Sequence, residues 1–226
     1  HIHFHHTMGL NPKLWVLAAD VGCAYDLTIH DYYLVNGNPT LTDAKARYVP
    51  DSACDFDARC AQHYPLPAGI DANQWRQNQR LIVENATRVI FPSADCCRRF
   101  LTFYDVKQSR VAWHPDYFLS QPYPVPTWNY CADLPLRVLV LGAISREKGA
   151  QLLEETAASL HGENIEFHLL GYAYRALASS VVTHGPYANH DVYALIGQIA
   201  PDVVWFPALW PETYSYTLSI ALHMGL

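Results

Sequence analysis

The fold class follows from one stretch, RVLVLGAISREKG at residues 137–149. Residues 137–141 are almost wholly apolar, as a parallel strand covered on both faces must be. Gly142 permits a tight turn after this strand, and residues 148–160 predict a helix. A buried strand that runs directly into a helix is the repeating unit of an α/β fold.

The same order of strand and helix continues toward both ends of the chain. After the stretch we expect strands at 165–170, 181–183 and 203–206, and helices near 175–179 and at 190–199 and 213–224. Before it we expect helices at 11–19, 73–86 and 93–104, the last capped by Ser93, and strands at 25–29, 88–91 and 110–113. Residues 32–68 carry Gly, Pro, Asn and Asp at short intervals, which predicts a long irregular connection.

A domain boundary is predicted between Pro115 and Pro135, a stretch that holds five of the fifteen prolines. Such a stretch sustains neither a helix nor a central strand. We therefore expect an α/β fold of two Rossmann-like lobes, with residues 1–116 in the first, a proline-rich linker at 117–135 and residues 136–226 in the second. A ligand is expected where the carboxyl ends of the strands face a cleft.

The composition excludes several classes of protein. Of the 226 residues, 50% are hydrophobic and 16% are charged, which indicates a globular chain rather than a disordered one. The net charge of −6 offers no basic face, so no nucleic-acid partner is expected. No apolar run reaches the roughly 18 residues of a membrane span, and no signal peptide is recognisable.

Neither the cysteines nor the histidines predict a metal site. The six cysteines are scattered without a C-x-x-C pair, which favours reduced thiols over a metal site at Cys54 and Cys60. The opening HIHFHH at residues 1–6 alternates histidine with apolar residues as a strand does. We therefore interpret these as histidines at the end of a strand, rather than as a tag or a metal site.

Two turns from strand to helix carry groups suited to an anion. The loop 142–149 brings Lys148 to a helix start, where free N–H groups, the helix dipole and a cation stabilise anionic oxygens. The loop lacks the spacing of a P-loop, so a solvated helix start is an equal alternative. The second turn, FPALWPETY at 206–214, has Glu212 at the next expected helix start, where Thr213 and Tyr214 offer backbone N–H groups. An acidic residue in that position is often only a partner of the helix dipole.

Together these segments resemble the GT-B-fold glycosyltransferases of the retaining group 1 or family 4 type. The resemblance rests on REKG at 146–149, FHLLG at 167–171, HGPY at 184–187 and WPETYSYTLS at 210–219, and in the first lobe on HFHH at 3–6, TIHDYY at 28–33 and VIFPS at 89–93. These motifs cover nearly the whole chain in the order of the family. The resemblance also implies that both lobes are incomplete, without the first elements of the acceptor lobe and the last elements of the donor lobe.

The resemblance implies a set of site residues. His30 and Glu212 would be catalytic, with His30 reaching the transferred sugar and Glu212 holding its hydroxyls. The donor diphosphate would be bound by Gly142, Arg146, Lys148, Thr213 and Tyr214, and the nucleotide near Gly171 and Tyr187. Two positions depart from the family: Ala143 replaces an arginine, and Ile220 replaces a glutamate that binds the ribose.

The function implied by the resemblance is transfer of a sugar, with retention, from a nucleoside-diphosphate sugar to an acceptor hydroxyl. Fixed N–H groups, helix dipoles and Lys148 would stabilise the leaving diphosphate without a metal, and no cofactor besides the donor is expected. The family suggests polysaccharide or lipopolysaccharide synthesis in the cytoplasm, with a glycan or lipid-linked acceptor, peripheral association with the inner face of the membrane, and further domains in the same chain.

Two other hypotheses remain open at this point. Ala143 and Ile220 motivate a non-catalytic lobe that binds a nucleotide sugar or acts as a scaffold in a larger assembly. A metal-binding protein rests only on the count of twelve histidines.

Overall fold

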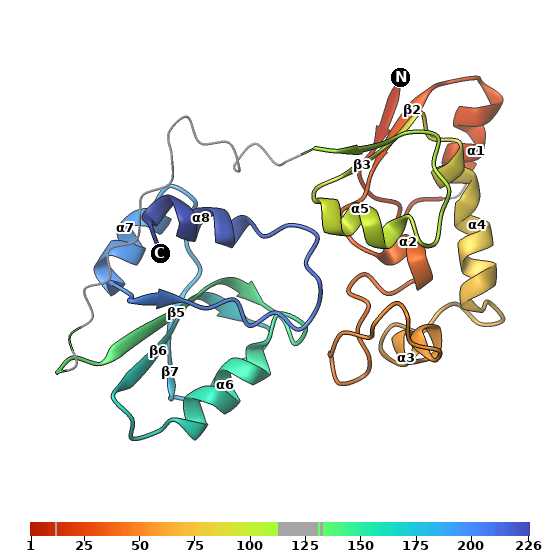
Figure 1. Cartoon of the computed structure of the whole chain (residues 1–226). Helices are drawn as coiled ribbons and strands as arrows, with labels where there is room; N and C mark the ends of the chain where they lie inside the picture. The colour runs from red at the N-terminus through yellow and green to blue at the C-terminus, as the bar shows by residue number, and fades with distance from the viewer. Residues whose placement is uncertain (12, 113–130, 132) are drawn as a thin grey trace. The chain divides into compact units, whose positions relative to one another are not determined.

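The chain divides into two compact units. The computed structural model describes residues 1–11, 13–112, 131 and 133–226. The first unit comprises His1–Pro115 and Trp210–Tyr214, and the second comprises Asp116–Leu209 and Ser215–Leu226 (Figure 1). Most of the linker predicted at 117–135 lies outside the described residues, and the predicted boundaries of the lobes stay a prediction.

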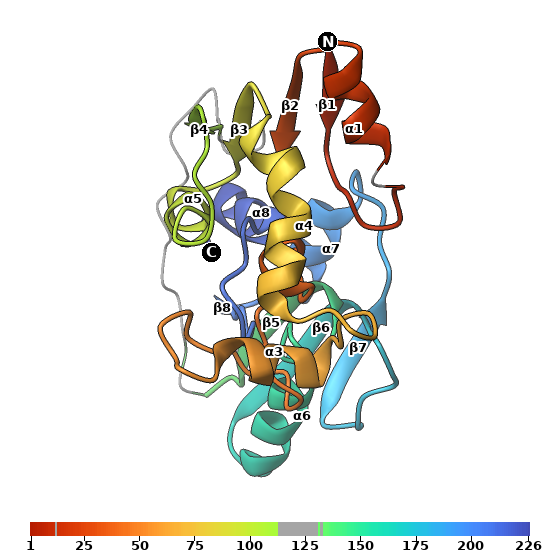
Figure 2. The same ribbon diagram turned by 90° about the vertical axis from the view of Figure 1, so that its right-hand side faces the viewer.

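The first unit is built on a parallel sheet of four strands in the order β1-β2-β3-β4. The strands are β1 (Ile2–Phe4), β2 (Tyr25–Thr28), β3 (Arg88–Phe91) and β4 (Ser109–Val111). The helices are α1 (Lys13–Asp20), α2 (Tyr33–Asn36), α3 (Phe56–His63), α4 (Ala72–Glu84) and α5 (Ala94–Phe100). Helices α1 and α4 lie side by side on one face of the sheet (Figures 1 and 2). The core between them includes Leu27, Ile82 and Val89, all fully buried.

Most elements of this unit follow the sequence pattern, including the cap of α5. The Ser93 hydroxyl accepts a hydrogen bond from the Cys96 amide at 3.2 Å, as expected for a helix N-cap. The prediction of one irregular connection over 32–68 is wrong in part, because α2 and α3 lie within it. Helix α2 has four residues and α3 buries only Phe56 and Cys60, so neither shows a full apolar period in the sequence.

The second unit is also built on a parallel four-stranded sheet, in the order β7-β6-β5-β8. The strands are β5 (Leu136–Ile144), β6 (Ile165–Ala173), β7 (Val181–Gly185) and β8 (Val203–Val204). The helices are α6 (Ala150–Ser159), α7 (Val192–Ile199) and α8 (Tyr216–Met224). Helix α6 covers one face of the sheet, and α7 and α8 cover the other (Figure 1). Both faces are therefore apolar, as the composition of β5 predicts.

Two helix predictions in this unit are corrected by the structure. No helix forms near 175–179, because side chains hold that segment instead: Arg175 pairs with Glu154, and the Ala178 amide donates to the same carboxylate at 2.7 Å. Helix α8 begins at Tyr216 rather than at residue 213, and the Ser215 hydroxyl caps it by accepting from the Leu218 amide. The helix N-terminus therefore lies after Thr213 and Tyr214, not at them.

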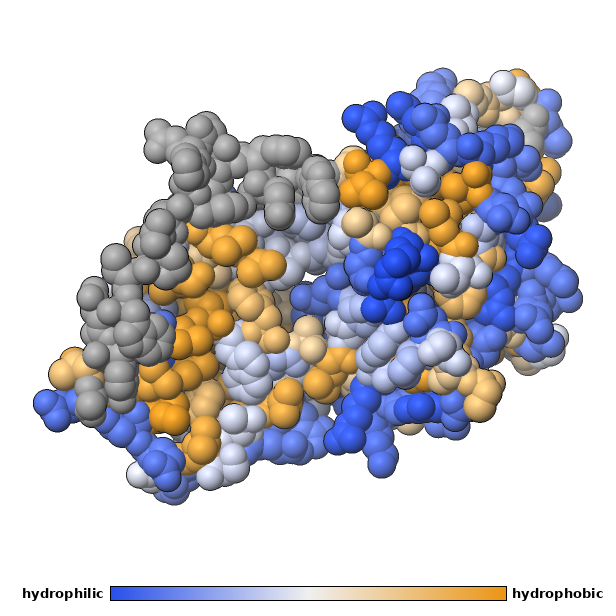
Figure 3. Space-filling model, in the orientation of Figure 1, coloured by the Kyte–Doolittle hydropathy of each residue, from blue (hydrophilic) through white to orange (hydrophobic). Residues whose placement is uncertain are grey.

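The surface of the second unit carries apolar side chains at one edge of its sheet. On the face that Figure 3 shows, hydrophobic residues gather over α8 and β8. The partly buried Val204, Phe206 and Met224 pack there against the core that α7 and α8 share. In the described part of the chain, no helix has the length and apolar character needed to cross a membrane.

Candidate functional site

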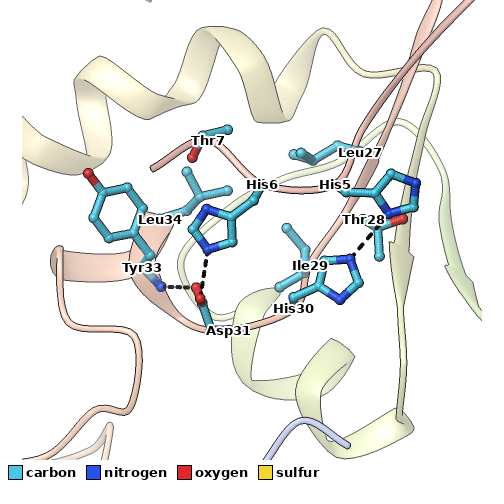
Figure 4. A pocket seen from close by; sticks show the side chains of 10 residues that line it. All are labelled: His5, His6, Thr7, Leu27, Thr28, Ile29, His30, Asp31, Tyr33 and Leu34. Carbon is cyan, nitrogen blue, oxygen red and sulfur yellow. Dashed lines mark hydrogen bonds and ion pairs between the residues drawn. The ribbon is translucent and has the colours of Figure 1, made fainter. Parts of the chain in front are cut away.

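Histidines gather in the first unit where β1 and β2 end. His5 and His6 follow β1, while His30 and Asp31 follow β2, and all four line one small pocket with Tyr33 (Figure 4). Its free volume of about 10 Å³ is room for roughly one water molecule. Because carboxyl ends of parallel strands lie at one edge of a sheet, these polar groups meet at the edge where α/β folds bind ligands.

Asp31 organises one side of this pocket. Its Oδ1 accepts a hydrogen bond from the Tyr33 amide at 2.9 Å, and its Oδ2 lies 2.7 Å from Nε2 of His6 (Figure 4). The Met8 amide donates to Nδ1 of His6 at 2.9 Å, so the proton of neutral His6 is on Nε2 and is donated to Asp31. One carboxylate oxygen thus holds the start of α2, and the other holds the ring of His6.

His30 lies on the other side of the pocket, next to His5. Nε2 of His30 is 3.3 Å from Nδ1 of His5. Partial burial lowers the pKa of His30 below its ordinary value, and the nearby His5 and His6 lower it further. The lowered pKa favours the neutral form of His30, the imidazole predicted to reach the sugar.

The segment Trp210–Tyr214, predicted to belong to the second lobe, is part of the first unit. The Thr213 hydroxyl donates to the His30 carbonyl at 2.6 Å, and the Trp210 ring meets the buried Tyr32 edge-on at 6.4 Å between ring centres. Thr213 is buried, while Glu212 and Tyr214 are partly buried. The structure thus brings this segment to the backbone of His30. The roles of Glu212, Thr213 and Tyr214 stay predictions.

In the second unit, two predicted glycines adjoin each other at the carboxyl ends of β5 and β6. Gly142 and Gly171 are paired in register, and both have positive φ angles, +96° and +137°. A β carbon at Gly171 would lie 2.0 Å from the Gly142 oxygen, and one at Gly142 would lie 3.0 Å from Cγ2 of Thr217. The same position at Gly142 is 4.0 Å from the Tyr187 hydroxyl. Gly171 is buried and Gly142 is partly buried, so the two strand ends pack backbone to backbone, with the first turn of α8 and Tyr187 beside them.

The basic residues of the 142–149 loop are exposed, as a role in anion binding requires. Arg146 and Lys148 both face solvent, and the Lys148 amide donates to the Ser145 hydroxyl at 3.2 Å. Gly149, with φ of +83°, touches Pro207 so closely that a β carbon would lie 2.1 Å from the Pro207 oxygen. The turns that follow β5 and β8 therefore pack against each other within this unit.

Ile220 lines a cavity of the second unit, between α7 and α8. The cavity measures about 300 Å³, and Tyr193 and Tyr216 line it with Ile220. Ile220 is partly buried and also packs against the core on this face of the sheet. The position where the family has a ribose-binding glutamate is thus an apolar wall of a cavity.

No metal centre is formed within the described residues. In that part of the chain no three His, Cys, Asp or Glu side chains are placed to hold a metal ion. Cys54 is exposed and Cys60 is buried, and burial raises the pKa of the Cys60 thiol to about 11. The Cys60 sulfur is therefore a protonated core group rather than a thiolate ligand.

Some residues at these two edges did not follow from the sequence as site residues. His5, His6 and Asp31 line the pocket of His30, and Thr217 covers Gly142. The signal for the first three was present: histidines directly after one strand and His-Asp after the next meet once the two strands pair in parallel. Thr217 carried no such signal, because its role depends on where α8 begins.

Comparison with solved structures identifies the fold. The chain is similar to crystal structures of Anabaena Alr3699/HepE in complex with UDP-glucose, with UDP, and with UDP and glucose. The TM-scores are 0.54, 0.52 and 0.54, and the sequence identities are 13%, 12% and 14%. The match covers 94% of this chain but only 56%, 54% and 55% of the other chains, so this chain spans about half their length. No protein-family model matches the chain, and no curated protein matches it in sequence. At this identity the likeness concerns the fold alone, and it confirms the prediction of an α/β chain with two Rossmann-like lobes.

Proposed function

We propose that this chain binds a nucleoside-diphosphate sugar and transfers the sugar to an acceptor hydroxyl. One observation carries the proposal: Gly142 and Gly171 bring the carboxyl ends of β5 and β6 close together beside the start of α8, at the ligand-binding edge of a parallel sheet. The similar structures of Alr3699/HepE hold UDP and UDP-glucose. These complexes support a uridine nucleotide as the first donor to test.

In this reaction the second unit would stabilise the leaving diphosphate. When the bond between the anomeric carbon and the diphosphate oxygen breaks, negative charge grows on that oxygen. The acceptor hydroxyl oxygen forms the new bond to the anomeric carbon, and its proton passes to the departing diphosphate. N–H groups at the start of α8, together with Lys148 and Arg146, are suited to that charge. Because Gly142 has no side chain, the first turn of α8 lies close to the end of β5, with Cγ2 of Thr217 3.0 Å from where a β carbon would be.

The first unit would supply the groups that act on the sugar. We propose that neutral His30 contacts the transferred sugar and that Glu212 holds its hydroxyls, with retention at the anomeric carbon and no metal in the transfer. A glycan or lipid-linked acceptor, and a role in cell-surface polysaccharide synthesis at the cytoplasmic side of a membrane, complete the proposal. These finer parts are carried by the resemblance of TIHDYY at 28–33 and WPETYSYTLS at 210–219 to the family.

A second candidate function is a non-catalytic unit that binds the nucleotide sugar. Ala143 is exposed at the end of β5 without the cation of the family, and Ile220 gives the ribose no hydrogen-bond acceptor. Both departures from the family remove contacts to the donor, but Gly142 and Gly171 remain at the ends of β5 and β6. Binding without turnover is the expected behaviour of such a unit.

A donor screen on the intact protein distinguishes the two. Release of nucleoside diphosphate is measured across common nucleotide sugars, starting with UDP-glucose, and binding of UDP is measured by calorimetry. Release that depends on an added acceptor supports the transferase, whereas UDP binding with no release from any donor supports the non-catalytic unit. If UDP does not bind and no donor releases nucleoside diphosphate, both proposed functions are refuted.

A further inference from the structure

The imidazoles of His5 and His30 share a direct hydrogen bond, just after the ends of β1 and β2. Nδ1 of His5 and Nε2 of His30 are 3.3 Å apart, and the ring centres are 5.5 Å apart with the planes inclined by 28° (Figure 4). His3 stacks on His5 at 4.2 Å and lies 2.8 Å from the Thr28 hydroxyl. His5 is thus held between two partners although it is exposed.

This hydrogen bond limits how many protons the pair carries. One of the two facing nitrogens donates its proton, and the other must accept it with a free lone pair. The bond therefore survives one protonation of the pair, on a nitrogen that faces away. It is lost when both rings become cationic, because both facing nitrogens then carry protons and the rings repel.

The surroundings favour the neutral ring of His30. Burial lowers its pKa most, and His5, His6 and His3 lower it as well, against the opposing effect of Asp31. The segment that holds the His30 carbonyl through Thr213 carries Glu212 as its ionisable acid. Because the Thr213 bond fixes the backbone of His30, its ring is the part left for His5 to orient.

We propose that His5 is a positioning residue, which fixes the tautomer and orientation of the His30 ring and shuts the His30 site when acid breaks their shared hydrogen bond. This inference rests on the proposed function, in which His30 contacts the sugar. In the active state one facing nitrogen is a donor and the other an acceptor, so the hydrogen-bonding character of the outward nitrogen of His30 follows the tautomer of His5.

The test compares two substitutions of His5 that keep different properties. His5→Phe keeps a stacking ring without nitrogens, and His5→Gln keeps a hydrogen-bonding group without a titrating one. His190→Gln is the matched control, since the His190 side chain is 82% exposed and lies in the second unit. Imidazole ¹⁵N spectra report the tautomer and titration of His30, and donor turnover is measured against pH.

We expect His5→Phe to mix the tautomers of His30, to move its titration to higher pH, and to lower kcat by about tenfold with a smaller change in KM. The acid limb of the pH–rate profile moves to higher pH with it. His5→Gln restores the single tautomer, while its titration and acid limb still move upward. The control changes none of these.

The inference is overturned if the tautomer and titration of His30 are the same in both His5 variants as in the control. It is also overturned if the titration moves but the acid limb of turnover does not. If the unsubstituted protein turns over no donor while the spectra show the coupling, the proposed function fails and the pairing of His5 with His30 stands.

Discussion

Replacing Gly171 by alanine is expected to destabilise the second unit, because this position has no space for a β carbon. The new atom would lie 2.0 Å from the Gly142 oxygen and 2.6 Å from the Gly142 carbonyl carbon. Both are backbone atoms of the neighbouring strand, so no side-chain rotation relieves the overlap. Gly171 also has φ of +137°, a conformation that L side chains rarely adopt.

The expected loss of stability has two contributions. The backbone conformation costs about 1–2 kcal/mol for a residue with a β carbon, and forcing β5 and β6 apart costs about 1–3 kcal/mol. Gly162→Ala is the matched control, since Gly162 has φ of +97° with no atom within 4 Å of the added carbon. The Gly162→Ala protein therefore loses only the stability that the backbone conformation costs. The difference between the two variants, about 1–3 kcal/mol, therefore measures the close approach of the strands.

Urea denaturation followed by circular dichroism measures both losses, and calorimetry with UDP measures binding. We expect Gly171→Ala to be the less stable variant and to bind UDP more weakly, because the displaced strand end carries the proposed phosphate site. Equal stability of the Gly171→Ala and Gly162→Ala proteins would refute the argument, since the steric contribution would then be absent.

Three further predictions concern other sites. Lys148→Gln lowers donor turnover at least about tenfold, more in kcat than in KM, because charge on the leaving diphosphate grows toward the transition state; an equal loss in Lys107→Gln would argue against a specific role. Arg88 holds the pKa of Asp26 below its ordinary value of about 4. Asp26→Asn therefore loses stability at pH 7. Urea titrations at falling pH should show that its stability deficit relative to the wild type shrinks as the wild-type carboxylate protonates; a deficit that stays constant between pH 5 and pH 2 would contradict this. Ile220→Glu places a carboxylate at the cavity wall and tightens UDP binding by about 1 kcal/mol; a fall in Tm that UDP does not recover would show that the side chain is needed in the core.

The strands of both units were predictable because their residues face a core on one or both sides. The run at 138–141 is apolar whichever face is considered, and β5 forms there and continues to Ile144. The predicted strand at 88–91 coincides with β3, since Val89 and Phe91 alternate toward the core. Burial acts on each of these residues directly, so the local sequence carries the signal.

The departures occur where distant residues decide the local structure. Thr213 precedes α8 because its hydroxyl bonds to His30, which is 183 residues away, and Ser215 caps the helix instead. The pocket of His30 likewise depends on the pairing of β1 with β2, which brings His5 to it. No local pattern reports such contacts. Such contacts can be predicted only from the fold itself or from the resemblance to the family.

The return of Trp210–Tyr214 to the first unit has a consequence for the order of folding. All four strands of that unit have been synthesised once residue 111 is added, yet its last segment follows β8 of the second unit. Tyr32 and the His30 carbonyl therefore lack their partners throughout the synthesis of about a hundred residues. Closure of so long a loop is slow compared with formation of local helices. We expect the first unit to collapse early during translation and to gain its full protection against hydrogen exchange near Tyr32 only after synthesis has passed Tyr214.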